Sequence, residues 1–181
     1  GTNAGSTSQF SSAVAIGNAA GRYNQAAQSI AIGIQAGFTA QKEDSVAIGT
    51  NAGQYYQEQR SVSIGYNAGN TGQNQDSIAI GSYSGQNNQG TGTIAFGANA
   101  GQYSQGNSSV AIGGNAGNTG QLGYAVAIGY GAGQNAQKDQ AVAIGLNAGQ
   151  QQQGTFSVAI GKNSAYNSQN TSAIAIGAYA G

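Results

Sequence analysis

Short apolar runs of one form recur along the whole chain at a fixed spacing of 16 residues. In the run Ser45–Gly49, the small residues Ser45 and Ala47 alternate with Val46 and Ile48. Alternation with period two is strand geometry, because successive side chains of a strand point to opposite faces. Val and Ile also favour strands over helices. The pattern therefore predicts one short β-strand in every repeat.

The repeat keeps its phase without an insertion or deletion. A glycine, taken as position 0, recurs twelve times from Gly1 to Gly177. Position +4 is Gly except at Ala165, position −2 is Ala except at Ser63, and position −1 is Ile except at Phe96. Position +8 is Gln in all eleven repeats that contain it. Such constancy indicates stacked coils, in which each residue meets its counterpart in the next coil.

One repeat has room for two strands and two turns. The segment Gly-x-Asn-Ala-Gly after the apolar strand predicts a turn, since Gly and Asn tolerate left-handed backbone conformations. A second, polar arm around the Gln then returns the chain. We predict an all-β fold, a parallel β-solenoid (β-roll) of about eleven 16-residue coils with two short strands each. At about 4.8 Å per coil, the rod is roughly 50 Å long.

The large apolar side chains at positions −3 and −1 are expected to form the core. A single coil cannot bury them, whereas stacking on two neighbours can. The predicted core residues are Val14, Ile16, Ile30, Ile32, Val46, Ile48, Val62, Ile64, Ile78, Ile80, Val110, Ile112, Val126, Ile128, Val142, Ile144, Val158 and Ile160.

The small residues at position −2 then face away from that core. They stay small where a solvent-facing strand would tolerate Thr, Lys or Gln, so we expect this face to pack against another copy of the chain. The alternative places the small residues inside a thin core and Val and Ile on the interface side. The candidate chain-chain face comprises Ala15, Ala31, Ala47, Ala79, Ala95, Ala111, Ala127, Ala143 and Ala159.

The invariant glutamine at position +8 is expected to point inward or into a turn. Its amide can then bond the same amide of the next coil, as in the amide ladders of cross-β structures. The predicted glutamine ladder comprises Gln25, Gln41, Gln57, Gln73, Gln89, Gln105, Gln121, Gln137 and Gln153.

Charged residues are few and occupy one part of the repeat. The chain has five basic and five acidic residues, and nine of these ten lie between positions +5 and +11. This distribution marks the solvated arm and turn. Stacking places Asp44, Arg60 and Asp76 in one column of alternating sign on three successive coils, which fixes the register by penalising like charges.

Composition excludes several classes of chemistry. Cys and His are absent, so there is no thiolate nucleophile, no Cys-based zinc site and no histidine base. We therefore expect no catalytic residue, no metal site and no cofactor, and we do not expect an enzyme. Zero net charge argues against nucleic acid as a partner. No apolar run is long enough to predict a membrane span.

The strings Ser45–Gly49 and Ala141–Gly145 resemble the repeat of trimeric autotransporter adhesin heads. Similar repeats occur in fibre proteins of phages and large viruses. The resemblance implies a left-handed parallel β-roll with three chains around one axis, on a cell or virion surface, with adhesion as the role. The Asn-x₅-Gln spacing, as from Asn51 to Gln57, also resembles that of curli-type functional amyloids, whose coils stack end to end.

Together these features predict an extracellular structural fibre, the shaft or head of an adhesin. Residues 1–181 are expected to be one repeat array without a domain boundary, a fragment of a longer fibre. The expected partners are further copies of the chain, in a trimer or an end-to-end filament, and a host-surface or matrix ligand. A matrix filament of functional-amyloid type is the alternative. Ice binding is a third possibility, but its typical regular Thr array is absent, since Thr recurs at position +6 only sporadically.

Overall fold

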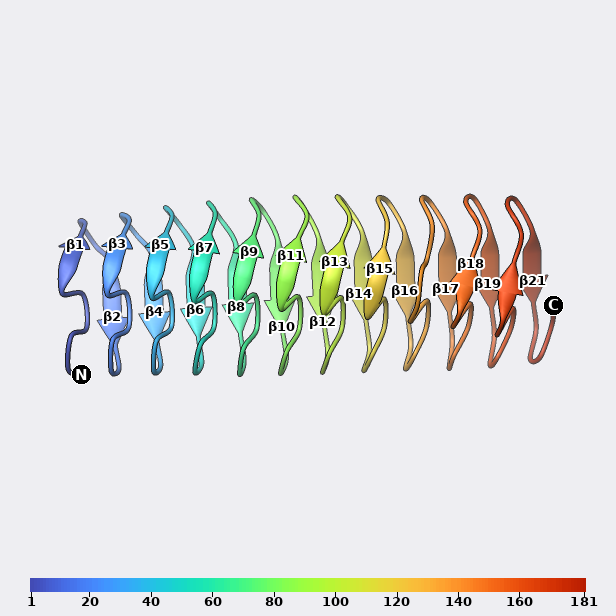
Figure 1. The fold of residues 1–181 in the computed structure, drawn as a ribbon, viewed down its shortest axis with the longest axis horizontal. Coiled ribbons are helices and arrows are strands. Elements are labelled where there is room, and N and C mark those ends of the chain that lie inside the picture. Colours follow the sequence, from blue (N-terminus) through green and yellow to red (C-terminus); the bar gives the residue numbers. More distant parts are fainter.

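The computed structural model describes all residues from Gly1 to Gly181 as a row of stacked coils with the termini at opposite ends (Figure 1). Every regular element is a β-strand of two or three residues. The strands form parallel sheets on two opposite sides of the rod, one long sheet on one side, and a long sheet and a separate pair of strands on the other. The predicted β-solenoid of 16-residue coils is thereby confirmed. No segment forms a helix with the length and hydrophobicity that crossing a bilayer requires.

The first sheet contains the apolar strand of each coil, and each strand pairs only with its counterparts in the adjacent coils. Its eleven strands are β2 (Val14–Ile16), β4 (Ile30–Ile32), β6 (Val46–Ile48), β8 (Val62–Ile64), β10 (Ile78–Ile80), β12 (Ile94–Phe96), β14 (Val110–Ile112), β16 (Val126–Ile128), β17 (Val142–Ile144), β19 (Val158–Ile160) and β21 (Ile174–Ile176).

The second sheet contains the polar arm that ends in the invariant glutamine. Its eight strands are β1 (Thr7–Gln9), β3 (Tyr23–Gln25), β5 (Thr39–Gln41), β7 (Tyr55–Gln57), β9 (Thr71–Gln73), β11 (Asn87–Gln89), β13 (Tyr103–Gln105) and β15 (Thr119–Gln121). A separate pair continues this side, β18 (Gln152–Gln153) and β20 (Ser168–Gln169).

The sheets have no register shift. Val110 pairs with Val126 and Ala111 with Ala127 across β14 and β16. Gln105 pairs with Gln121 across β13 and β15. Each side chain therefore stacks on the equivalent side chain one repeat away, as the constant 16-residue phase requires.

The interior is built from small residues and glutamine. The expected core of Val and Ile is wrong, because both residues of each apolar strand point outward and keep part of their surface exposed, as at Val14 and Ile16. The alanines at position −2 point inward and, from Ala31 to Ala159, are fully buried. They cannot serve as the chain-chain face proposed for them, and the alternative with small residues inside and Val and Ile outside is the arrangement found.

The narrow gap between the sheets explains this orientation. A Cβ added to Gly53, on the arm leading to the second sheet, would lie 3.3 Å from the Cβ of Ala47 in the first. There is no room at Ala47 for Val or Ile. The alternation along a strand allows either of its faces to be buried. The narrow gap accepts only small side chains, so it decides that the Ala face is buried.

The second sheet changes course near the C-terminal end. Residues at position +7 from Ser8 to Ala136 have positive φ, whereas Gln152 and Ser168 do not. The change lies next to Ala165, the one residue that replaces Gly at position +4. In other coils, a Cβ at this position would meet the amide of the buried glutamine, as at Gly149, where it would lie 2.8 Å from Gln153 Oε1. The altered arm begins at Gln152, in a coil that keeps Gly149, so the methyl group of Ala165 does not by itself account for it.

Candidate functional site

The buried glutamines join the two sheets. Gln105 Nε2 donates to the carbonyl oxygen of Ile94 in the first strand of its own coil at 3.0 Å, and to the carbonyl oxygen of Ser109 at 3.4 Å. The same nitrogen also donates to Oε1 of Gln121 in the next coil at 3.2 Å. This amide therefore ties one sheet to the other and one coil to the next.

The amide-to-amide contacts form a chain along the axis. They run without a break from Gln57 to Gln137, and a further contact joins Gln153 to Gln169. No amide contact joins Gln25 to Gln41, and the Oε1 atoms of both are buried without a partner. The nine predicted glutamines thus share one column, in which the axial bonds are confined to the middle and C-terminal coils.

Replacing Gln105 with Met is expected to lower the free energy of unfolding by about 2–3 kcal/mol. Met has a similar length but leaves the buried carbonyl of Ile94 and the amide of Gln121 without this partner. Urea unfolding followed by circular dichroism measures the change. Gln75→Met is the control, since Gln75 is exposed in a turn. Equal unfolding midpoints for the two variants would contradict a structural role for the buried amide.

A strip of Val and Ile covers the outer face of the first sheet. Positions −3 and −1 are occupied by apolar residues in all eleven strands, and the side chains point away from the interior. In the middle of the rod, Phe96, Ile112 and Ile128 are 51%, 36% and 36% exposed. A flat apolar strip roughly 50 Å long exceeds what a soluble monomer normally leaves uncovered. This surface fits the packing of another chain.

A second column of amides lies at position +5, where the chain enters the second sheet. Asn70 donates to Gln54 Oε1 at 3.0 Å, and Gln102 donates to Gln86 Oε1 at 2.9 Å. Sequence reasoning missed this column, although its signal is present as an amide in seven successive coils. These residues are Gln54, Asn70, Gln86, Gln102, Asn118, Gln134 and Gln150.

The charge column contains one ion pair. Arg60 Nε lies 2.7 Å from Asp76 Oδ1, and Arg60 Nη2 lies 3.1 Å from Asp76 Oδ2. Hydrogen bonding to Asp76 raises the pKa of Arg60, with Asp44 adding a weaker attraction. Hydrogen bonding from Arg60 lowers the pKa of Asp76 below its ordinary value. Within this column, the ion pair is therefore formed by Arg60 and Asp76, and Asp44 contributes only a weaker attraction.

The lowered pKa of Asp76 predicts a small loss of stability in acid. Because the folded-state value lies below the unfolded one, the ion pair stabilises the fold above about pH 4 and loses this effect as the pH falls through the folded value. Asp76→Asn is expected to shift the urea midpoint more at about pH 7 than at about pH 2. The pair is exposed, so added salt is expected to shrink the difference. An equal shift at both pH values would argue against the ion pair.

Aromatic side chains form small groups on neighbouring coils. The rings of Tyr23 and Phe38 meet edge to face at 5.3 Å, with Tyr55 at 6.3 Å from Phe38. The Arg22 guanidinium lies 4.9 Å from the Tyr23 ring centre. In the turn that follows the first strand, hydrogen bonding with Tyr66 raises the pKa of Tyr83. These contacts couple adjacent coils and do not form a continuous platform.

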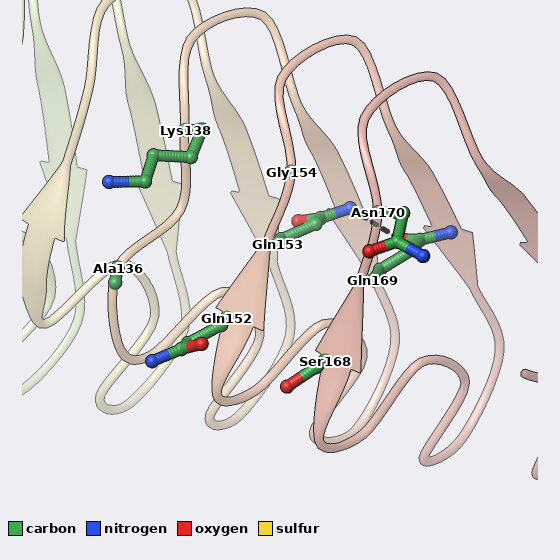
Figure 2. A pocket seen from close by; sticks show the side chains of 8 residues that line it. All are labelled: Ala136, Lys138, Gln152, Gln153, Gly154, Ser168, Gln169 and Asn170. Atoms are coloured by element: carbon green, nitrogen blue, oxygen red, sulfur yellow. Dashed lines mark hydrogen bonds between the residues drawn. The ribbon is translucent and has the colours of Figure 1, made fainter.

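A groove of about 310 Å³ lies on the second-sheet side near the C-terminal end (Figure 2). Three consecutive coils contribute to it through Lys138, Gln152 and Ser168. These side chains lie on the outer side of the arm, whereas Gln153 and Gln169 extend between the sheets. No group of three or more His, Cys, Asp or Glu side chains is placed to hold a metal ion.

Two segments of the sequence match one family of repeats. Residues 25–52 and 123–148 match the YadA head domain repeat. The resemblance inferred from the SVAIG-type strings is thus confirmed. Both matches contain strands of the first sheet, β4 and β6 in one and β16 and β17 in the other. No significant match occurs among curated proteins or among solved structures.

YadA heads are parts of trimeric adhesins and are exposed at the cell surface. The family is structural and adhesive rather than enzymatic. The stacked β-coils and the two YadA head repeats together are features of an adhesin-type structural repeat protein. A role as a structural fibre fits both the fold and the family match.

Proposed function

We propose that this chain forms part of an extracellular adhesin-type fibre, in which three copies pack their Val and Ile strips around a common axis. The observation that carries the proposal is the orientation of the first sheet. Its large apolar side chains lie outside the coil, where only another chain can bury them fully. A straight, flat strip suits a partner that runs alongside over the whole length of the rod.

The YadA head match supports the number of chains and the surface location. Burying the strip toward an axis leaves the second sheet and both turns facing solvent. Those parts carry the variable residues of the repeat, including Arg60, Lys138 and Tyr124, which are exposed. The buried parts thus hold the fibre together, and the outer turns remain free to contact a ligand at regular intervals.

Sedimentation of the purified chain tests this proposal. Wild-type protein is expected to sediment as a trimer, and Ile112→Lys is expected to be monomeric with an unchanged circular dichroism spectrum, because a charge in the strip is costly to bury. Ser104→Lys, on the exposed face of β13, is the matched control and should remain trimeric. A folded wild-type monomer would overturn the proposal.

The alternative assembly is a filament of coils stacked end to end. The in-register parallel strands and the axial amide chain favour it, since cross-β fibrils use the same two features. Electron microscopy distinguishes the arrangements. The trimer shows three chains per cross-section, whereas an end-to-end filament of single chains shows one chain and a length that grows with protein concentration.

A further inference from the structure

The groove in Figure 2 differs from the rest of the second-sheet surface. Elsewhere, the residue at position +7 has positive φ, but Gln152 and Ser168 have left that conformation. The small residues Ala136 and Gly154 line the space beside them. The hollow thus lies where the arm is altered.

The lining of the groove is polar. One of its eight residues is hydrophobic, whereas pockets for apolar ligands are lined mainly by aliphatic and aromatic side chains. Gln152 and Asn170 offer amide donors and acceptors, and Ser168 offers a hydroxyl. All three residues are exposed. This combination suits a ligand with many hydroxyl groups.

Lys138 lies at one edge of the groove, and its side chain extends toward the preceding coil, away from Ser168 and Asn170 (Figure 2). Its neighbour Asp139 points toward the preceding coil, where its Oδ1 accepts a hydrogen bond from the backbone nitrogen of Gly123 at 3.1 Å. The one ion pair of the molecule lies elsewhere, between Arg60 and Asp76. The Lys138 ammonium is thus available to an anionic group of a ligand.

We propose that this groove binds a saccharide that carries a carboxylate. The Lys138 ammonium, at one edge of the groove, pairs with the carboxylate, while Gln152, Ser168 and Asn170 hydrogen-bond hydroxyl groups elsewhere on the saccharide. The inference deepens the proposed function and rests on it, because a surface fibre brings the groove to the glycans that contain such sugars. The groove lies on the side opposite the Val and Ile strip, so packing around an axis leaves it open.

A shallow site of this kind is expected to bind weakly as a single copy. Three copies in one fibre present three equivalent grooves, and many fibres present more. Linked weak sites raise the overall affinity by about 10²–10⁴ when the ligand is also multivalent. The groove therefore gives the fibre a means to bind glycan-coated surfaces without a deep pocket.

Nuclear magnetic resonance titration of the assembled chain tests the proposal. The probes are 3′-sialyllactose, a uronate oligosaccharide and neutral lactose, which distinguish the two sources of a sugar carboxylate and the need for it. Binding of either acidic sugar, with chemical-shift changes at Gln152 and Ser168, is the expected result. Equal binding of lactose, or no binding of any probe, would overturn the proposal.

Variants locate the site. Lys138→Gln is expected to weaken binding of the acidic sugar by about tenfold, the usual effect of losing one charge-assisted hydrogen bond. Lys162→Gln is the matched control, because Lys162 is also exposed but lies outside the groove. Equal weakening by both variants would mean that the sugar binds through the overall positive charge of the chain and not through the groove, which would also overturn the proposal.

The same samples keep this inference separate from the proposed function. Sedimentation reports whether the trimer forms, and the titration reports whether the groove binds. A trimer that binds no acidic sugar defeats the inference and leaves the fibre proposal intact. A monomer that binds through Lys138 supports the site and defeats the trimer.

Discussion

Gly97→Ala is expected to lower the free energy of unfolding by more than about 4 kcal/mol, enough to disrupt the coils around it. Gly97 has a φ of 128°, a conformation that is essentially restricted to glycine. A Cβ at this position would lie 2.8 Å from the carbonyl carbon and oxygen of Gly113. The atoms it meets belong to backbone, which the neighbouring coils hold in place, so the clash cannot be relieved by a side-chain movement.

Gly120→Ala is the matched control for this substitution. Gly120 also has positive φ, at 67°, but its added Cβ would have no neighbour closer than the Cα of Ala136 at 3.9 Å. Strain in the folded state and the lower entropy of the unfolded chain act in opposite directions here, so a loss of about 1 kcal/mol is expected. Urea unfolding followed by circular dichroism compares the two. Similar midpoints would contradict the role assigned to the position 0 glycines.

Ala111→Leu is the second substitution with a large expected effect, a loss of more than about 3 kcal/mol. Ala111 is fully buried, and a Cβ added to the facing Gly117 would lie only 3.3 Å from the Ala111 Cβ. The extra atoms of Leu would push the two sheets apart. This separation would also break the hydrogen bond from Gln121 to the Val110 carbonyl, which is 2.9 Å long.

Ala98→Leu serves as the control, because Ala98 is exposed at position +1, where the chain carries Leu146 in a later coil. It is expected to change the unfolding midpoint little. The comparison tests the orientation of the apolar strand directly. If Val110 and Ile112 faced the interior, Ala111 would lie on the surface and its replacement by Leu would be as harmless as the control.

The repeat length could be read directly from the sequence. The glycines at position 0 and the glutamines at position +8 recur at 16 residues without a break. Such a pattern allows only coils that stack in register, and the two sheets follow from the apolar and polar halves of the repeat. The ion pair of Arg60 and Asp76 also follows, because residues 16 apart in the chain lie side by side in space.

The orientation of the apolar strand could not be derived in the same way. A strand with period two has two faces, and burial of the larger residues is the ordinary expectation. Here the buried side is set by the distance between the sheets, which the short Gly and Ala side chains and the bridging Gln amides keep small. The large residues Val110 and Ile112 are therefore left outside, where they become the candidate interface.

The groove at Lys138 could not be predicted from the sequence either. Its signals were present as the substitution of Gly by Ala165 and the run of four glutamines from Gln150 to Gln153. Neither indicates by itself that the second arm changes its path. The groove forms from residues of three successive coils, and only the folded structure shows how the path of the arm brings them together.

The sequence by itself determined that this chain is a rod of β-coils, because stacked coils require equivalent residues to recur at a fixed spacing, here 16 residues. It also determined which residues share a column. The tertiary structure alone decided which columns are inside and which are outside, because that choice depends on the gap between two sheets and not on the alternation along one strand. The strip of Val and Ile therefore lies on the surface, where chains can meet, and not in the core of one chain.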